Sequence, residues 1–495
     1  MTCFAWTGRL KAWRRAALAP LVLALAGCAL GPDYRRPAVE LPARFPGEPA
    51  ATAEAPPAMP HRWWVQFEDA ELNRLMELAL RHNSDLLQAA ARVEQAEALL
   101  REARAAQWPR LDAEGAASRG RSTATTGLPG GGLTANSFRL AATTSFEIDF
   151  WGRLRRASEA ARAQALASRY GHEVVRQTVA GLVAQSYFSL RALDEQIALT
   201  RETLRTREEA LRLLRLRLQS GAGGQLEVDQ AEGLRADAAL QLRELERQRA
   251  LAQSRLGLLT GQAGLALEEG RVRSLPLPPT PPAGLPSSLL ERRPDVRQAE
   301  QLLVSANAQI GVAKAAMFPT LSLTGLAGGQ SAELSDLLRS GSRIWSLGFG
   351  LTLPLFDAGR RLAQTEQAEA RQREALAAYQ GAVQAAFKDV ADALANLRAA
   401  RESQADAEAS ERAATRALDL AHKRYDAGYS GYLELLDAQR TANSARLRSS
   451  RKRCGNLNRT LRAFARIWSG SKSLPRRRGA RSASKSACAC NCRRA

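Results

Sequence analysis

Two proline-free stretches, each much longer than a globular core requires, constrain the fold of this chain most. The first runs for 68 residues from Gly152 to Gln219, and a matching stretch runs from Arg360 to Ala427. As one continuous helix, at about 1.5 Å per residue, either stretch would reach about 100 Å. Within both stretches aliphatic residues recur every seven positions: Leu190, Ile197, Leu204, Leu211 and Leu218, then Val383, Val390 and Leu397. This seven-residue repeat predicts long helices packed against partner helices. A plain coiled-coil rod is the alternative interpretation.

The net charge of +21 is concentrated at the two ends of the chain. Residues 1–27 hold four Lys or Arg and no acidic residue, and residues 448–495 hold fifteen and none. The rest of the chain is therefore nearly neutral, which argues against a nucleic-acid-binding surface spread over the protein. Only 5% of the residues are aromatic and 24% are charged, a composition typical of a helix-rich chain.

The N-terminus has the features of a secretory leader. Four basic residues precede an apolar run, Ala16–Ala26, that is too short to span a bilayer. The run ends in Leu25-Ala26-Gly27-Cys28, which resembles the bacterial lipoprotein cleavage box and makes Cys28 the expected site of lipidation. Ala29 follows, and not the aspartate that retains lipoproteins in the inner membrane, so this resemblance implies the outer membrane. The proline-rich segment from there to Pro60 is expected to be an extended tether.

The chain contains one structural plan twice. The segments before the two long stretches align at an offset of 210 residues, and the stretches themselves at an offset of 207. A proline-rich linker separates the two halves. Landmarks at nearly constant spacing indicate internal duplication. They are Asn83-Ser84-Asp85-Leu86 with Arg293-Pro294-Asp295-Val296, Gln107-Trp108-Pro109 with Met317-Phe318-Pro319, Gly152-Arg153 with Gly359-Arg360, and Gly221 and Gly224 with Gly428 and Gly431.

Each half also holds two segments in which apolar and polar residues alternate with the period of a β-strand. The clearest are Phe138–Phe150 and Trp345–Leu353, about the length of a tilted membrane strand. Their partners begin after Pro109 and Pro319, across Gly- and Ser-rich loops. An ordinary half-buried sheet is the alternative interpretation. If the strands span a membrane, the four of one chain cannot close a barrel, because spanning barrels have at least about eight strands and lipid does not tolerate an open sheet edge. Three chains would supply about twelve strands, so the sequence favours a trimer.

No catalytic constellation is found in the sequence. The four histidines, His61, His82, His172 and His422, are scattered without the spacing of a metal site. The glycine run at residues 130–132 lacks the Lys and the Ser or Thr of a phosphate-binding loop. We therefore expect no enzyme activity, no metal and no cofactor.

Together these motifs resemble the TolC-like outer membrane efflux proteins, in the lipoprotein branch that serves resistance-nodulation-division pumps. The resemblance implies a mainly α-helical fold with a membrane β-barrel contribution, in a homotrimer with a 12-stranded barrel above a periplasmic α-helical barrel. It implies export of small molecules such as drugs, together with a periplasmic adaptor and an inner-membrane pump. It covers about residues 28–447 and rests on the lipoprotein box, the duplicated plan, and three segments: Phe150-Trp151-Gly152-Arg153, Phe356-Asp357-Ala358-Gly359-Arg360 and Tyr432–Arg440.

The resemblance also assigns candidate functional residues. Leu433, Asp437 and Arg440 lie at spacings that place them on one helix face. They match the family's periplasmic aperture: an apolar ring, an acidic ring and an arginine that ties neighbouring helices. Without the resemblance, the Asp and Arg would be read as an ordinary surface pair. Two glycine-bearing turns match the helix tips that meet the adaptor, where glycine permits a left-handed backbone; their glycines are Gly221, Gly224, Gly428 and Gly431.

The expected organisation follows in chain order. Residues 1–27 are the signal peptide, 28–60 the lipid-anchored tether, 61–274 the first repeat, 275–286 the linker, 287–468 the second repeat and 469–495 a basic tail. Strands are expected at about 109–118, 136–150, 319–328 and 344–354, and helical hairpins at 152–261 and 360–468.

The C-terminus departs from the pattern of the family. At the 207-residue offset, Ser449, Lys452 and Asn458 stand where the first half has leucines, so the apolar stripe is lost. The chain then runs to Cys488-Ala489-Cys490-Asn491-Cys492, whose spacing is not that of a zinc site. Our interpretation is a reading-frame change near residue 447 or a degenerate tail, which leaves the integrity of the last helix in doubt.

Two other functions compete with an efflux duct. A lipid-anchored periplasmic coiled-coil adaptor would account for the long helices, but adaptors lack two pairs of membrane-length strands. A duct for type I-like secretion of proteins or peptides shares every feature described above, so the sequence does not separate it from a small-molecule duct.

Overall fold

The computed structural model describes residues 29–40, 42, 45, 62–121, 123, 134–271 and 293–467, except for the side chains of 465–467. Cys28, the linker at 275–286 and the tail at 469–495 lie outside these residues. The elements are η1 (Trp63–Phe67), α2 (Ala70–His82), α3 (Ser84–Ala105), β1 (Arg110–Arg121), β2 (Thr134–Ile148), α4 (Arg153–Gln219), α5 (Gln225–Thr260), α6 (Pro294–Ala315), β3 (Thr320–Ser331), η4 (Leu334–Asp336), η5 (Ser340–Ser342), β4 (Arg343–Thr352), α7 (Arg360–Asp426) and α8 (Tyr432–Ile467).

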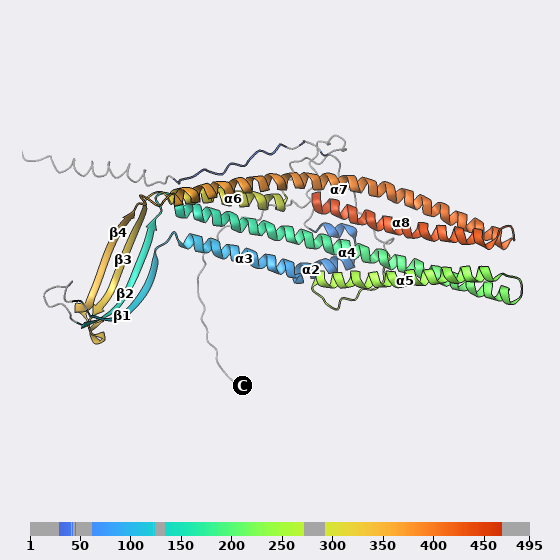
Figure 1. Ribbon diagram of the computed structural model, residues 1–495, viewed down its shortest axis with the longest axis horizontal. Helices are drawn as coiled ribbons and strands as arrows, with labels where there is room; N and C mark the ends of the chain where they lie inside the picture. Colours follow the sequence, from blue (N-terminus) through green and yellow to red (C-terminus); the bar gives the residue numbers. More distant parts are fainter. Residues whose placement is uncertain are drawn as a thin grey trace, which may run out of the picture.

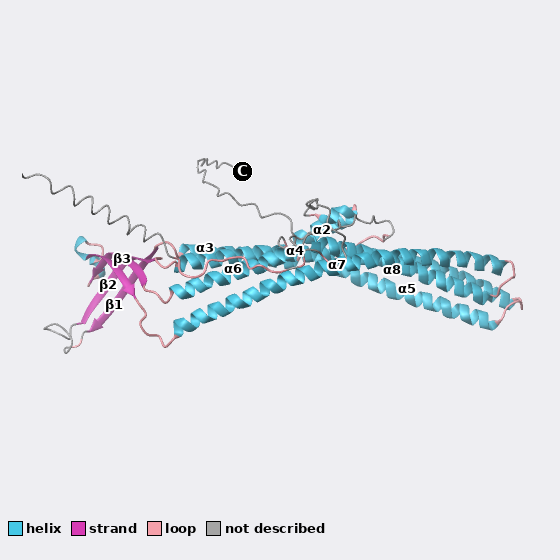
Figure 2. Cartoon of the chain, turned by 90° about the horizontal axis from the view of Figure 1, so that it is seen from above, coloured by secondary structure: helices cyan, strands magenta, loops and turns pink. Residues whose placement is uncertain are grey.

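The two halves of the chain are built from helices of equal length. α4 and α7 have 67 residues each, α5 and α8 have 36, and α3 and α6 have 22. The helices run along one long axis, and the sheet stands at one end at an angle to them (Figure 1). The hairpins α4–α5 and α7–α8 reach the far end together (Figure 2). The mainly helical fold with a small antiparallel sheet, predicted from the sequence, is confirmed.

The four strands form one antiparallel sheet in the order β1-β2-β3-β4. Leu140 in β2 lies opposite Gly115 in β1 and Gly329 in β3, and partners directly opposite share one face. Leu140 is 47% exposed and Phe349 in β4 is 65% exposed, so this face presents apolar side chains to its surroundings. Because the sheet is open, β1 and β4 are edge strands whose outer backbone groups have no partner strand within the described chain.

The long helices are arranged side by side as a layer. Near the sheet the neighbours are α3–α4–α6–α7, and toward the far end they are α5–α4–α8–α7. The predicted heptad positions face this packing, since Leu190, Ile197 and Leu211 are buried in α4 and Val390 and Leu397 in α7. None of the described helices is both long and apolar enough to span a lipid bilayer.

The strand-to-helix junctions explain the two glycine-arginine motifs of the sequence. Gly152 and Gly359 precede α4 and α7 with φ of 77° and 83°, a left-handed conformation that favours glycine. The Asp149 carboxylate accepts hydrogen bonds from two backbone N–H groups in the first turn of α4 and so caps the helix. The indole N–H of Trp151 donates to the Pro319 carbonyl at 2.8 Å, which joins the first repeat to the second.

The segment directly after Cys28 is extended, as expected of a tether, but it is bound to the fold and not free. Leu30 donates its backbone N–H to the Trp151 carbonyl at 3.1 Å. The Arg156 side chain, 7% exposed, donates to the Leu30 carbonyl and, at 2.7 Å, to the Asp33 carboxylate. Gly31 lies so close to α6 that a Cβ there would approach a backbone atom at 2.6 Å.

Further along, the same segment crosses the second repeat. Arg36 binds the Glu300 carboxylate with two hydrogen bonds of 2.7 and 2.9 Å. The Phe45 ring stacks on Phe387 with 4.8 Å between centroids. The described part of this extended segment is thus docked on both repeats. Backbone carbonyls and polar side chains make part of these contacts, and the apolar side chains that pack on the second repeat, Tyr34, Val39 and Phe45, have no regular spacing that would reveal them.

The last helix continues through the region where the sequence leaves its integrity in doubt. α8 runs to Ile467, and Cys454, Leu457 and Leu461 lie in the same buried cluster as residues of α4 and α5. The apolar stripe is displaced onto these residues, and α8 ends one residue before 468, where the sequence predicts the end of the hairpin. Burial raises the pKa of the Cys454 thiol to about 11, and the thiol donates to the Phe188 carbonyl at 3.3 Å.

Candidate functional site

The two hairpin tips are copies of one turn. A left-handed glycine ends each long helix, Gly221 with φ 74° after α4 and Gly428 with φ 78° after α7. In the first tip the Ala222 N–H donates to the Arg217 carbonyl at 2.9 Å, and the Gly221 N–H donates to the Leu218 carbonyl at 3.0 Å. The second tip repeats both bonds 207 residues later. This is the Schellman pattern, which satisfies the last carbonyl groups of a helix.

The other two predicted tip glycines differ from these. Gly224 precedes α5 with φ −102°, and Gly431 is not among the glycines with positive φ. A Cβ at either position would meet no atom within 4 Å. Of these four glycines, only Gly221 and Gly428 adopt the left-handed backbone that glycine permits.

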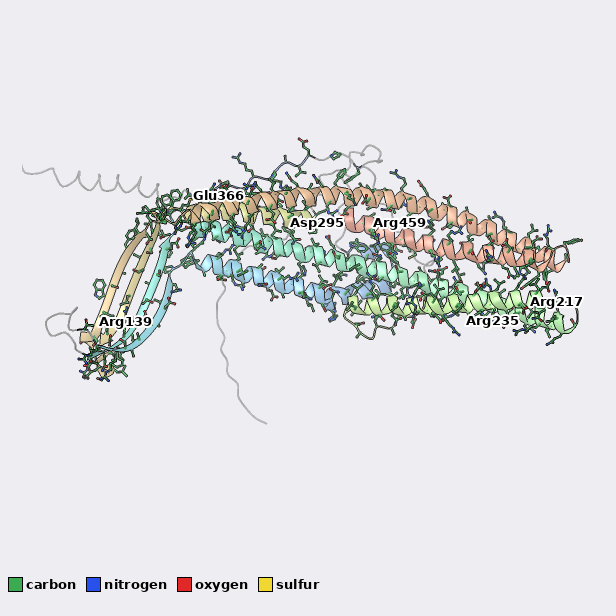
Figure 3. The ribbon with its side chains drawn as sticks, in the orientation of Figure 1. Arg139, Arg217, Arg235, Asp295, Glu366 and Arg459 are labelled. Atoms are coloured by element: carbon green, nitrogen blue, oxygen red, sulfur yellow. The ribbon has the colours of Figure 1, made fainter. Side chains whose placement is uncertain are left out.

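Close behind the tips, a buried apolar cluster joins all four helices. Arg217, at the far end of the molecule (Figure 3), donates to the Tyr425 hydroxyl at 2.6 Å and so ties the last turn of α4 to that of α7. The Tyr425 ring lies 5.9 Å from that of Tyr432, and burial raises the pKa of the Tyr432 hydroxyl above its ordinary value. The buried members of the cluster are Leu211, Leu214, Val228, Ala231, Ala421, Tyr432 and Leu435.

The three predicted aperture residues lie on the exposed face of α8. Leu433 is 65% exposed, and Asp437 and Arg440 are exposed as well. Within the part of the chain that the structure describes, neither charged side chain takes part in an ion pair. A single chain therefore brings the three to one face but leaves them without the partners expected of an aperture. At the matching positions of α5 the first repeat has Leu226, Gln230 and Gly233.

A buried acidic residue that the sequence analysis missed lies in α4. The side chain of Asp194 is 0% exposed and accepts from Arg191 at 3.1 Å and from Arg249 of α5 at 2.6 Å. It also accepts the Gly270 backbone N–H at 3.0 Å. The cluster clamps the segment after α5 onto α4. Its members lie up to 76 residues from Asp194 in the sequence, so only the acidic residue itself, at a helix-packing position, could have indicated the cluster.

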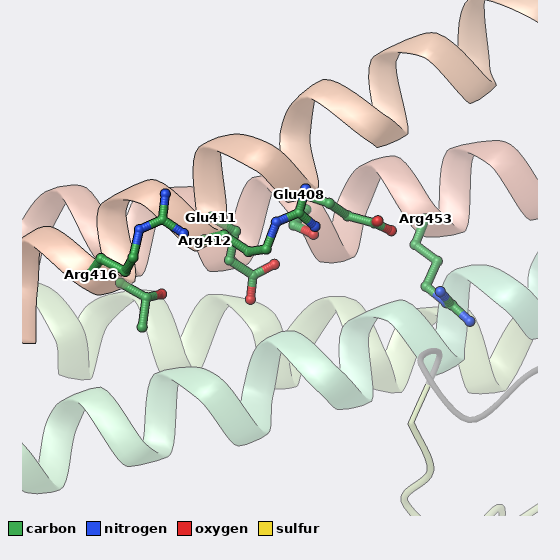
Figure 4. A pocket seen from close by; sticks show the side chains of 7 residues that line it. Glu408, Glu411, Arg412, Arg416 and Arg453 are labelled. Carbon is green, nitrogen blue, oxygen red and sulfur yellow. The ribbon is translucent and has the colours of Figure 1, made fainter.

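An open groove of about 460 Å³ runs between α7 and α8 (Figure 4). Its charged side chains come mainly from α7, and Arg453 reaches in from α8. The lining residues are Glu408, Glu411, Arg412, Thr415, Arg416, Ser449 and Arg453. The described residues contain no group of three or more His, Cys, Asp or Glu that could hold a metal ion.

Comparison with known proteins gives consistent matches along the chain. The family model of the outer membrane efflux protein matches residues 75–262 and 285–466. Outer membrane protein OprJ of Pseudomonas aeruginosa is 37% identical over 469 residues, which cover 93% of this chain and 98% of OprJ. Cation efflux system protein CusC of Escherichia coli K12 is 35% identical over 429 residues, or 86% of this chain and 93% of CusC.

A solved structure supports the same likeness. The crystal structure of the Campylobacter jejuni CmeC outer membrane channel superposes with a TM-score of 0.81 at 28% sequence identity. The match covers 90% of this chain and 95% of CmeC.

Proposed function

Because the chain belongs to the outer membrane efflux protein family and is an outer membrane exit channel of an efflux system, we propose that three copies close into one duct. The sheets of the three chains join as a barrel of twelve strands in the outer membrane. The long helices join as a second barrel that extends into the periplasm. The duct carries small molecules such as drugs from an inner-membrane pump to the exterior.

The open edges of the fold carry this proposal. β1 and β4 end the sheet, and α7 and α5 end the helical layer on its two sides. In lipid, each unpaired backbone group at an exposed sheet edge costs several kcal/mol. Summed along one edge strand, this cost is on the order of the stability of a whole domain. Pairing β4 of one chain with β1 of the next removes every edge when the ring closes. Three chains of four strands give the smallest ring of known barrel size that leaves a lumen.

The face of the sheet that meets lipid follows from the same arrangement. Leu140 and Phe349 lie on the exposed apolar face, whereas Ser145 lies on the other face of β2. Replacing Phe349 with Arg is expected to cost about 2–4 kcal/mol at the bilayer midplane in each chain and to prevent assembly. Ser145→Arg is the matched control. Ala141, 3% exposed, and Gly350, where a Cβ would lie 2.7 Å from the Ser322 hydroxyl, are too closely packed for that purpose.

The helix tips are the proposed docking site for the periplasmic adaptor. Gly221 and Gly428 give both tips the same turn, so six similar tips would surround the axis of a trimer. Asp437 and Arg440 are proposed to close the periplasmic end, with each arginine bound to a neighbouring chain. Cys28 is the proposed site of acylation. A cation is the alternative cargo, because the relative CusC is named for cation efflux.

Membrane fractionation and gel mobility test the proposal directly. The mature protein is expected in the outer membrane as an oligomer whose gel mobility changes only after heating. Palmitate labelling is expected for the parent and not for Cys28→Ser. A mature protein recovered only as a soluble periplasmic monomer would contradict the duct. Export assays with an organic drug and with a metal cation then separate the two classes of cargo.

A further inference from the structure

One face of the sheet ends in arginine at its outer end. On the face that carries Leu140, apolar side chains follow one another from the helix end of each edge strand toward the hairpin loops and then give way to guanidinium groups. On β4 the order is Leu351, Phe349, Leu347, Trp345 and Arg343. On β1 the order is Leu111, Ala113, Gly115, Ala117, Arg119 and Arg121.

The strand register places these arginines on the same face. Gly115 lies opposite Leu140, Leu140 opposite Gly329, and Gly329 opposite Arg343. Arg119 is an even number of residues beyond Gly115 and therefore shares its face. We define Arg119 and Arg343 as the arginine rim. Both are exposed.

The residues around the rim do not neutralise its positive charge, and the apolar row of the sheet ends beside it. Arg119 and Arg343 make no ion pair with any residue that the structure describes. In the loop between β3 and β4, Asp336 is paired with Arg339 at 2.9 Å, and Glu333 is the other acidic residue there. The same loop exposes Leu338 to 85%. Apolar side chains and unpaired cations thus lie together at this end of the sheet, as at the boundary between hydrocarbon and headgroups.

The opposite face of the sheet has a different pattern. Arg139, marked on the sheet in Figure 3, lies opposite Ala116 and Gln330 and therefore on the other face. Arg110 is on that face too and is paired with Asp112 at 2.6 Å. These arginines do not continue an apolar row, so they serve as an internal reference for the rim.

We propose that the arginine rim binds the phosphate groups of anionic lipid headgroups in the outer leaflet of the membrane. The proposal rests on the proposed function, which places the sheet in the outer membrane with its hairpin loops outward. Guanidinium binds phosphate with two parallel charge-assisted hydrogen bonds, and Trp345 sits one step inward, at the level where indole rings favour the interface. Where β4 of one chain pairs with β1 of the next, the rim arginines of two chains gather at each seam.

Lipid titration of the purified full-length oligomer tests the proposal. The probes are diphosphorylated lipid A, its dephosphorylated form and inorganic phosphate, with bound lipid counted by native mass spectrometry. The parent is expected to bind the phosphorylated lipid at least about tenfold more tightly than the dephosphorylated form, since each Arg near an anionic surface contributes on that scale. Inorganic phosphate at equal concentration is expected to leave the lipid bound, and displacement of the lipid by it would overturn the lipid assignment.

Two variants make the test specific. Arg119→Gln with Arg343→Gln is expected to remove most of the preference for phosphorylated lipid, about tenfold. Arg139→Gln, which removes a charge from the other face, is expected to retain the preference. If the rim variant binds like the parent, or if Arg139→Gln loses as much, the proposal is wrong. Single-channel conductance of the rim variant is expected to equal that of the parent, so a failure of the rim is distinguishable from a failure of the duct.

Discussion

The two helical hairpins have the same lengths and the same turn, yet they are held together by different chemistry. In the first, buried Asp194 of α4 binds Arg249 of α5 at 2.6 Å. At the matching positions of the second hairpin stand Arg401, which is exposed, and Asn456, which donates to Gln404 at 2.6 Å. An ionic clamp in one repeat is replaced by a neutral amide pair in the other. The duplication preserved the backbone and let the internal ties diverge.

The exposed faces near the tips differ in the opposite sense, because there the second hairpin carries the charges. The exposed face of α8 carries Asp437 and Arg440, whereas α5 has Gln230 and Gly233 at the matching positions. Separating a buried charge from its partners costs more than separating two amides. We infer that the first hairpin is held together more firmly than the second.

The largest difference is expected from removing the buried charge. Asp194→Ala leaves two arginines, 11% and 18% exposed, without their carboxylate, and is expected to lower the free energy of unfolding by about 3–5 kcal/mol. The matched variant Arg401→Ala alters an exposed side chain and is expected to change it by less than about 0.5 kcal/mol. Denaturant unfolding followed by helical circular dichroism compares them. Equal effects would show that the two hairpins are not held differently.

A smaller effect is expected from the neutral pair. Asn456→Ala leaves the buried Gln404 side-chain oxygen without this donor, which costs about 1–3 kcal/mol. The loss is expected to stay below that of Asp194→Ala in the same unfolding measurement. A larger loss in Asn456→Ala would show that the second hairpin is the more firmly held of the two.

The turns are expected to respond alike in both repeats. Gly221→Ala and Gly428→Ala place a side chain at φ 74° and 78°, a left-handed backbone that costs about 1–2 kcal/mol for a residue with a Cβ. Gly224→Ala and Gly431→Ala serve as controls because neither glycine has a positive φ, while a Cβ meets no atom within 4 Å at any of the four positions. Thermal unfolding is the measurement. A difference between the repeats here would mean that the turns, and not only the ties behind them, have diverged.

The smallest effect is expected from the exposed ion pair of the first hairpin. Arg215 and Glu232 are 3.1 Å apart with side chains 53% and 55% exposed. Solvent screening leaves such a pair worth about 0.2–1 kcal/mol at most, so Arg215→Ala is expected to shift unfolding only slightly, and less so in high salt. A loss comparable to that of Asp194→Ala would show that surface charges, and not the buried cluster, hold the first hairpin together.

The sequence predicts the helices and their tips because the signals there are local. Heptads, missing prolines and the glycine turns are readable within one segment, and Leu211 and Gly428 take the places they imply. The alternation in β2 and β4 also predicts which residues share a face, although it does not reveal that Ala141 is tightly packed.

The remaining features depend on neighbours that are distant in sequence. Asp194 meets Arg249 and Gly270, 55 and 76 residues away, and its local pattern is that of an ordinary charged helix. The docked segment after Cys28 offers backbone carbonyls to Arg156, and carbonyls leave no trace in a sequence. In α8 the buried apolar positions include Cys454 and Leu457 and differ from those of the first repeat. Comparison with the first repeat alone therefore suggests that the apolar stripe is absent.

Single-channel conductance in planar bilayers tests the central claim, that a duct is closed by the second hairpin, most directly. Asp437→Ala with Arg440→Ala removes the charged groups from the exposed face of α8 and is expected to raise conductance and weaken cation selectivity, because three acidic groups around one axis attract cations. Gln230→Ala, the matching position in α5, is expected to conduct like the parent. Unchanged conductance in the double variant, or an equal rise in Gln230→Ala, would contradict the account.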